Sequence, residues 1–213
     1  MKKKQVIVIG GGESFASHRA YLSFLKKKEI DFEQYRRPRR GWKEMLGTAL
    51  GSRFEVIRIG MPNPLNAKYA EWKLWFEKFV PRLARETAFV GHSLGGVFLA
   101  KYLSENQFPK TIRATFLVAA PFGWVDFSLP RNLARFARQG GTIFIYQSAD
   151  DAVVPPPDAE KYGKALPRAV ARRFRRRGHF NQTSFPELVE DLKASWARGR
   201  RDPFRSRAGG RII

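Results

Sequence analysis

The sequence contains no cysteine and only three histidines. Without cysteine, disulfide bridges and thiolate-bound metal sites are excluded. The absence fits a reducing compartment, and we expect a cytoplasmic protein. No ligand cluster for a metal or an organic cofactor is visible either. The sequence therefore predicts chemistry that uses neither.

Long hydrophobic runs are also absent. No stretch approaches the roughly 20 apolar residues that span a bilayer. The apolar run after Lys4 ends at Gly10, which is too short for a signal peptide and lacks a cleavage site. The chain of 213 residues, 43% hydrophobic and 14% aromatic, has the composition of a soluble globular protein. We expect one domain over residues 1–198 and a basic, mobile tail over residues 199–213.

Acidic residues are scarce relative to basic ones, with 19 Asp and Glu against 40 Lys and Arg, a net charge of +21. Such a charge attracts polyanions non-specifically, whatever the protein does. Arginines cluster at residues 36–40, at residues 172–177 and in the tail. No zinc-finger spacing, aromatic RNA-binding pattern or helix-turn-helix accompanies them. A solvated basic surface is therefore favoured over specific nucleic-acid binding.

Short β-branched runs alternate with longer amphipathic segments, the pattern of a parallel sheet with crossover helices. The strands are expected at residues 6–9, 54–59, 87–91, 114–118, 142–146 and 169–174. Helices are expected at residues 17–28, 66–84, 94–105, 129–139, 157–166 and 185–197, with a weaker one at 42–50. The aromatics of residues 72–79 have the spacing of a core-facing helix stripe. The fold class is therefore α/β, a three-layer α/β/α sandwich with a mainly parallel sheet of about six strands and no large cap.

The segment Gly91-His92-Ser93-Leu94-Gly95 has the G-x-S-x-G pattern of a nucleophile elbow. A buried strand precedes it and a helix follows it, which is the context that this motif requires. A sharp strand-to-helix turn exposes the serine hydroxyl, and the flanking glycines let the chain pass close to itself. A serine that merely caps a helix is the alternative interpretation. Ser93 is the candidate nucleophile.

Two backbone amides are candidates for an oxyanion hole. The Leu94 N–H lies at the start of the helix after Ser93. The second donor is expected from the glycine loop after the first strand, as the N–H of Gly12 or of Glu13. That loop fails the dinucleotide pattern G-x-G-x-x-G because Phe15 stands where the third glycine would fall.

A catalytic serine needs a base and an acid, which follow it along the chain in this fold. His179 comes after the last predicted strand and is the candidate base. His92 lies inside the elbow with its side chain expected to point away from the hydroxyl, and His18 precedes the serine. After the fifth strand, Asp150 and Asp151 are both candidates for the acid. The loop position and the pattern D-x-x-V-P favour Asp151 over Asp150, which would then brace the loop through backbone N–H groups.

With these elements in order, the chain resembles the small, lidless α/β-hydrolases related to retinoblastoma-binding protein 9 and their bacterial relatives. The resemblance covers about residues 5–197, and the basic insertion at residues 30–53 and the tail depart from it. It implies triad roles for Ser93, Asp151 and His179, and an all-parallel sheet whose second strand lies outside the first. The marks that carry it are the glycine loop, Met61-Pro62-Asn63-Pro64 with Trp72 downstream, the elbow, Ser148-Ala149-Asp150-Asp151 with Val154-Pro155, and Gly178-His179-Phe180.

The predicted activity is hydrolysis of an ester, thioester or amide through an acyl-enzyme, with a small-molecule acyl substrate. Phe122, Trp124 and Phe127, after the fourth strand, either form an apolar acyl pocket or pack the loop onto the core. The arginines at residues 172–177 either favour an anionic substrate or protect an edge strand. Two alternatives remain open: an acyltransferase, and a hydrolase-fold protein that binds a protein or nucleic acid through its basic surface.

Overall fold

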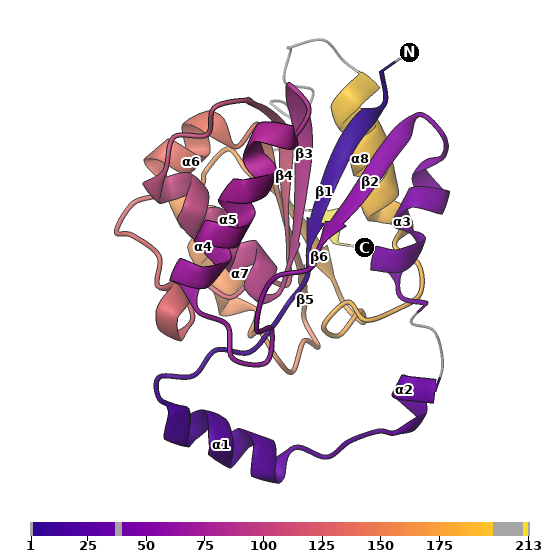
Figure 1. The fold of residues 1–213 in the computed structure, drawn as a ribbon. Helices are drawn as coiled ribbons and strands as arrows, with labels where there is room; N and C mark the ends of the chain where they lie inside the picture. The colour runs from indigo at the N-terminus through magenta and orange to yellow at the C-terminus, as the bar shows by residue number, and fades with distance from the viewer. Residues whose placement is uncertain (1, 37–39, 198–210, 213) are drawn as a thin grey trace.

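A single parallel sheet forms the centre of the molecule (Figure 1). The computed structural model describes residues 2–36, 40–197 and 211–212. The strand order is β2-β1-β3-β4-β5-β6-β7, and every neighbouring pair is parallel. The strands are β1 (Lys4–Ile9), β2 (Phe54–Ile59), β3 (Glu86–His92), β4 (Thr111–Val118), β5 (Thr142–Ser148), β6 (Val170–Phe174) and the short β7 (Arg211–Ile212). The predicted parallel sheet is confirmed, with β2 outside β1.

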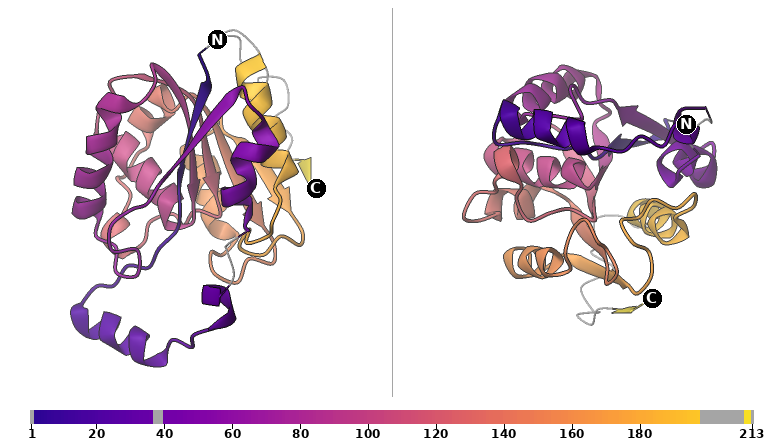
Figure 2. Two further views of the ribbon diagram at one scale, coloured as in Figure 1. Left: turned by 45° about the vertical axis from the view of Figure 1, so that its right-hand side comes forward. Right: turned by 90° about the horizontal axis from the view of Figure 1, so that it is seen from below.

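Helices cover both faces of the sheet, which gives the predicted three layers (Figure 2). Alternate residues of β1 enter different cores: Ile7 and Ile9 face one side, whereas Val6 and Val8 face the other. The first core is closed by α4 (Tyr69–Phe79), α5 (Leu94–Glu105), α6 (Ala134–Gln139) and α7 (Pro157–Ala165). The second is closed by α3 (Trp42–Leu50) and α8 (Pro186–Ala197).

The aromatic stripe of α4 packs into the first core as its spacing predicts. Trp72 and Phe76 are fully buried, and both rings meet Phe98 of α5 edge-on at 5.6 and 5.5 Å. Each such burial contributes about 1.5–3 kcal/mol to stability. Trp75 differs from this pattern. It stays 41% exposed and donates its indole N–H to the Gly60 carbonyl.

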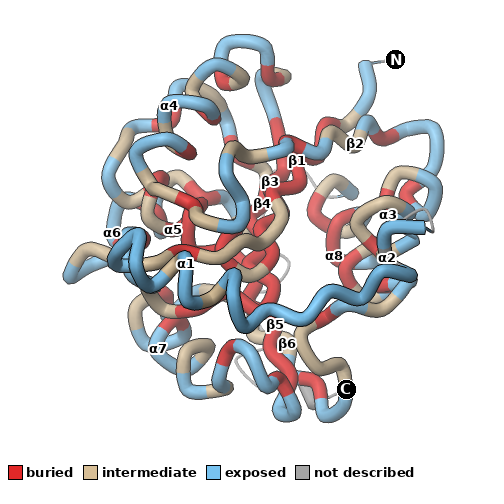
Figure 3. Tube along the Cα trace, turned by 60° about the horizontal axis from the view of Figure 1, so that its bottom comes forward, coloured by how far each residue is buried: buried red, intermediate tan, exposed pale blue. Residues whose placement is uncertain are grey.

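Residues 18–36 form an arm that leaves the body of the protein at the carboxyl edge of the sheet (Figures 1 and 3). It contains α1 (His18–Lys27), which lies within a predicted helix, and the short α2 (Glu33–Arg36). Only α2 was not predicted from the sequence. Ser17 caps α1 by accepting a hydrogen bond from the Ala20 N–H at 3.1 Å. Helix α1 buries no residue, and the rings of its Tyr21 and Phe24 contact Phe15. Of the three helices that lie between β1 and β2 along the chain, α3 is therefore the one that packs on the sheet.

The predicted tail, residues 199–213, lies outside the described residues apart from β7. Its mobility stays a prediction. Among the helices that the structure describes, none combines the length and the apolar character needed to cross a membrane.

Candidate active site

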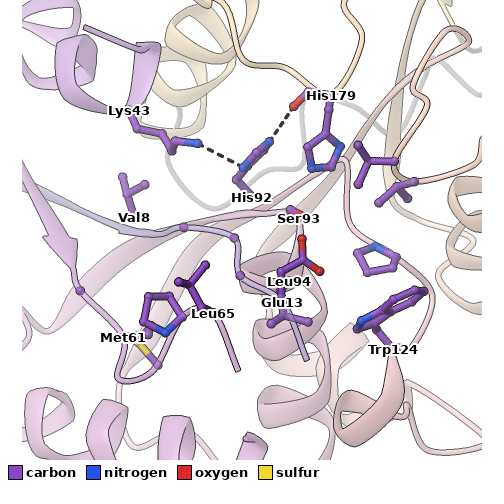
Figure 4. A pocket seen from close by; sticks show the side chains of 18 of the residues that line it. Val8, Glu13, Lys43, Met61, Leu65, His92, Ser93, Leu94, Trp124 and His179 are labelled. Carbon is purple, nitrogen blue, oxygen red and sulfur yellow. Dashed lines mark hydrogen bonds between the residues drawn. The ribbon is translucent and has the colours of Figure 1, made fainter. Parts of the chain in front are cut away.

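A pocket of about 810 Å³ opens at the carboxyl edge of the sheet (Figure 4). In parallel α/β sheets this edge collects the loops that follow each strand, because all strands point the same way. Here the loops after six strands contribute to one pocket. Its lining includes Gly10–Glu13 after β1, Gly60 and Met61 after β2, Ser93 after β3, Pro121 after β4, Val153–Pro155 after β5 and His179 after β6.

Ser93 occupies the turn between β3 and α5 in a strained backbone conformation. Its φ of 54° and ψ of −125° lie in a region that side-chain-bearing residues rarely adopt. The surrounding main chain holds it there, since the Ser93 N–H donates to the Val118 carbonyl at 2.8 Å. The close passage of the chain requires glycine. A Cβ on Gly91 would lie 2.6 Å from the Gly95 carbonyl oxygen, and one on Gly95 would collide with the carbonyl of Ile9.

His179 lies on the loop after β6 and is held by Asp151. Its Nδ1 is 3.0 Å from one carboxylate oxygen of Asp151 and 3.1 Å from the other. Since Nδ1 faces Asp151, Nε2 is the nitrogen left for the pocket, which Ser93 also lines. An imidazole oriented in this way can accept a proton and share the resulting charge with the carboxylate.

The two neighbouring aspartates have different environments. Asp151 is buried, and besides His179 it accepts hydrogen bonds from the N–H groups of Val153 and Val154 at 2.9 and 3.0 Å. Asp150 is exposed and does not contact the imidazole. It accepts from the Ser148 hydroxyl and from the Gly178 N–H at 2.8 Å, and these bonds hold its pKa below the usual value. Asp150 therefore braces the loop that carries His179.

The glycine loop after β1 passes directly over Ser93. Of the two amides that the sequence left open there, the Glu13 N–H donates to the Pro64 carbonyl at 2.8 Å, which leaves Gly12. Gly11, which the sequence did not single out, lies nearer the serine. A Cβ on Gly11 would stand 2.9 Å from the Ser93 Cβ. Leu94, which follows Ser93 in the chain, is the first residue of α5, so its N–H lies at a helix N-terminus.

Comparisons with known proteins identify the family of this chain. The family model described as serine hydrolase matches residues 35–192. The chain belongs to the serine hydrolase family. Among curated relatives, serine hydrolase RBBP9 of Rattus norvegicus is 25% identical over 150 residues, which are 66% of this chain and 77% of the relative.

Solved structures share the fold. The ydeN gene product of B. subtilis superposes with a TM-score of 0.67 at 20% identity, over 92% of this chain and all of that one. A putative yden-like hydrolase from Pectobacterium atrosepticum has a TM-score of 0.58 at 15% identity, over 91% of this chain and 90% of its own. The resemblance to small α/β-hydrolases is confirmed.

The loop after β4 of this serine hydrolase contributes one of its three predicted aromatic residues to the pocket. Trp124 lines the pocket and is 48% exposed. Phe122 is not among the lining residues; its ring packs edge-on against Tyr162 at 4.9 Å, and Phe127 is fully buried in the first core. The loop needs two of the aromatics for its own packing, a demand that local sequence does not reveal.

The arginines near His179 are not among the residues that line the pocket of this serine hydrolase. Arg172 makes two hydrogen bonds to Asp191 of α8, at 2.8 and 2.7 Å. Arg177 pairs with Glu187 on the same helix. The cationic side chains that do line the pocket are Lys28, Lys43 and Arg58.

His92, set aside by sequence reasoning, links two parts of the site (Figure 4). Its ring is buried, with Nε2 2.8 Å from the His179 carbonyl oxygen and Nδ1 3.2 Å from the Lys43 ammonium. Burial, together with the charge of Lys43, lowers the pKa of His92 well below its ordinary value. His92 is therefore a neutral structural link at neutral pH. His18, the third histidine, is exposed on α1. Within the described ranges, no group of three or more metal-ligating side chains was found.

Proposed function

We propose that this serine hydrolase cleaves carboxylic esters of small acyl substrates through an acyl-enzyme intermediate. Ser93 is the nucleophile, His179 the general base and Asp151 the residue that orients the imidazole. One observation carries the proposal: Asp151 holds Nδ1 of His179, and the same imidazole shares a pocket with the strained Ser93. Thioesters and amides are attacked by the same chemistry and belong to the proposed substrate range.

The reaction proceeds in two displacements. His179 Nε2 removes the Ser93 hydroxyl proton while Oγ attacks the carbonyl carbon, and the tetrahedral intermediate collapses as the imidazolium returns the proton to the leaving alcohol. Water then attacks the acyl-serine while His179 removes its proton, and the proton returns to Ser93 as the acid product leaves. Asp151 stays ionised throughout and stabilises the imidazolium.

The negative oxygen of each tetrahedral intermediate needs donors that are already in place. The Leu94 N–H at the start of α5 and the Gly12 N–H of the glycine loop are assigned this role. The start of α5 at Leu94 and the place of Gly12 in the pocket lining with Ser93 support the assignment, as does the hydrogen bond of the Glu13 N–H to Pro64. Each donor is expected to contribute about 10²–10³ to kcat.

Labelling with a fluorophosphonate, followed by a panel of p-nitrophenyl esters of increasing acyl length, tests the proposal. Wild-type protein is expected to be labelled and to turn over the shorter esters, and Ser93→Ala and His179→Ala are expected to lose both properties. Ser23→Ala removes an exposed hydroxyl on α1 and is the matched control, expected to behave as wild type. Turnover that survives in both site variants contradicts the mechanism. Product analysis with added alcohols separates hydrolysis from acyl transfer.

A further inference from the structure

Exposed apolar side chains gather at the end of the molecule where the pocket opens. Among the described residues, eight of the twelve exposed large apolar side chains lie on the arm or at the pocket. Soluble proteins scatter such residues singly, and a gathered set marks a contact surface. The five on the arm are Leu22, Leu25, Ile30, Phe32 and Tyr35, with 39% to 74% of each exposed.

The arm and the pocket form one continuous surface. Tyr35 of the arm lines the pocket, and so do Leu65, Trp124 and Val153, each 47% to 62% exposed. Figure 3 shows the arm crossing the carboxyl edge of the sheet as a largely exposed band. Four exposed apolar side chains, which we call the rim together with the arm, therefore line the pocket that contains Ser93.

Basic residues accompany this apolar surface. Residues 18–36 carry five Lys or Arg against three Asp or Glu, and Lys26, Lys27 and Lys28 follow one another at the end of α1. Lys28 also lines the pocket. A helix that buries no residue, yet bears exposed apolar and basic side chains, has the character of an element that lies in a lipid interface.

We propose that the arm and the rim, defined as residues 18–36 with Leu65, Trp124 and Val153, dock on an anionic lipid surface. The apolar side chains enter the boundary between headgroups and acyl chains, and the lysines contact the anionic headgroups. Docking brings the pocket mouth to the lipid. Delivery of lipid-borne acyl esters to Ser93 rests on the proposed function, whereas docking itself does not.

Charge favours lipid over a second copy of the chain. Each copy carries a net charge of +21, and its arm has more basic than acidic residues, so pairing two arms would bring like net charges together. An anionic leaflet offers the opposite charge to the lysines and an apolar layer to Ile30 and Phe32. Both features of the arm are then used by one partner.

Sedimentation with vesicles tests the docking. The full chain is mixed with vesicles of phosphatidylcholine alone or with equal parts of phosphatidylglycerol, and the bound fraction is measured. The variant Ile30→Ser/Phe32→Ser removes apolar surface without changing the charge. Its partition onto the anionic vesicles is expected to fall by at least about tenfold. Met45→Ser/Leu74→Ser removes exposed apolar surface from α3 and α4 instead and is expected to bind as wild type.

Three outcomes overturn the proposal. Wild-type protein stays in the supernatant with anionic vesicles; or both double variants bind as wild type, which assigns binding to net charge alone; or light scattering shows that the arm variant converts a dimer to a monomer, which assigns the surface to a second copy.

Docking and catalysis are separated by two further measurements. Ser93→Ala is expected to bind anionic vesicles as wild type does, so a failure of the proposed chemistry leaves the docking result readable. The arm variant is expected to keep its turnover of soluble p-nitrophenyl butyrate and to lose at least about tenfold on p-nitrophenyl palmitate dispersed in the anionic vesicles. Equal loss on both esters contradicts a role for the arm in delivery.

Discussion

The imidazole of His92 donates a hydrogen bond from Nε2 to the main-chain carbonyl of His179, over 2.8 Å. The donor is identified by the other side of the ring, where the Lys43 ammonium lies 3.2 Å from Nδ1. An ammonium can only donate, so Nδ1 accepts and the ring proton is on Nε2. The residue next to the proposed nucleophile thus holds the backbone of the proposed base.

This link predicts a loss of stability in mild acid. Because burial lowers the pKa of His92 below its ordinary value of 6.5, the unfolded chain binds a proton there before the folded chain does. The contribution of His92 is complete above about pH 6.5 and is lost as the pH falls from there toward the lowered folded pKa. The free energy of unfolding is expected to drop by up to about 1.4 kcal/mol per pH unit from this group. Urea denaturation at a series of pH values measures it.

His92→Gln removes the titrating group and is expected to flatten this part of the pH profile. His18→Gln removes an exposed histidine from α1 and is expected to leave the profile unchanged. A profile of equal steepness in wild type and His92→Gln excludes His92 as the source.

Substitutions at Ser93 are expected to separate strain from chemistry. Glycine accepts a φ of 54° at little cost, so Ser93→Gly should stabilise the fold by about 1 kcal/mol while turnover falls roughly 10⁴- to 10⁶-fold. Ser93→Ala removes the hydroxyl but keeps the strained backbone, and it should lose turnover without the gain in stability. Thermal unfolding and ester turnover of both variants are the measurements. Equal stability of the two variants argues against stored strain at the elbow.

The two aspartates should differ sharply when each is replaced by asparagine. Asp151→Asn replaces the carboxylate that fixes the imidazole tautomer with an amide and is expected to lower kcat by roughly 10⁴-fold. Asp150→Asn keeps an oxygen that can accept from Gly178 and should lower kcat by less than about tenfold. Steady-state kinetics on one p-nitrophenyl ester compare them. The reverse order would assign the acid to Asp150.

Gly10 and Gly11 are adjacent in the glycine loop and provide a matched pair of positions for substitution by alanine. A Cβ at Gly11 meets the Ser93 side chain, whereas a Cβ at Gly10 meets no atom within 4 Å. Gly11→Ala is therefore expected to displace the serine or the glycine loop and to lower kcat by about 10²-fold, and Gly10→Ala should retain activity. If both variants match wild type in turnover, the loop does not approach the reacting atoms as closely as the structure places it.

The sheet and the elbow were predictable because each rests on a local signal. Apolar runs such as residues 87–91 specify buried parallel strands. Gly91, Ser93 and Gly95 lie within five consecutive residues, so the elbow motif can be read directly from the chain. The order of strands followed from the resemblance. Residues 94–105 and 42–50 also form helices with the predicted bounds, since their apolar spacing matches the faces they bury.

What the sequence did not provide depends on contacts between distant segments. The bond between His92 and Lys43 joins residues 49 apart, and nothing near either one signals it. Phe122 packs against Tyr162 because α7 happens to lie beneath the loop after β4. For α1, the periodicity gave the helix correctly but not its partner: the same apolar stripe suits a sheet face or an exposed arm.

One early tryptophan ties the loop of His179 to the first part of the chain. The Trp42 indole N–H donates to the Phe180 carbonyl at 2.7 Å, and its main-chain N–H donates to the Gln182 carbonyl at 3.0 Å. The first of these bonds spans 138 residues. A ribosome that adds about 5–20 residues per second needs roughly 7–28 s to cover that span. Trp42 and the elbow therefore emerge well before His179, and a nascent chain cannot assemble the proposed site until the loop after β6 has also emerged.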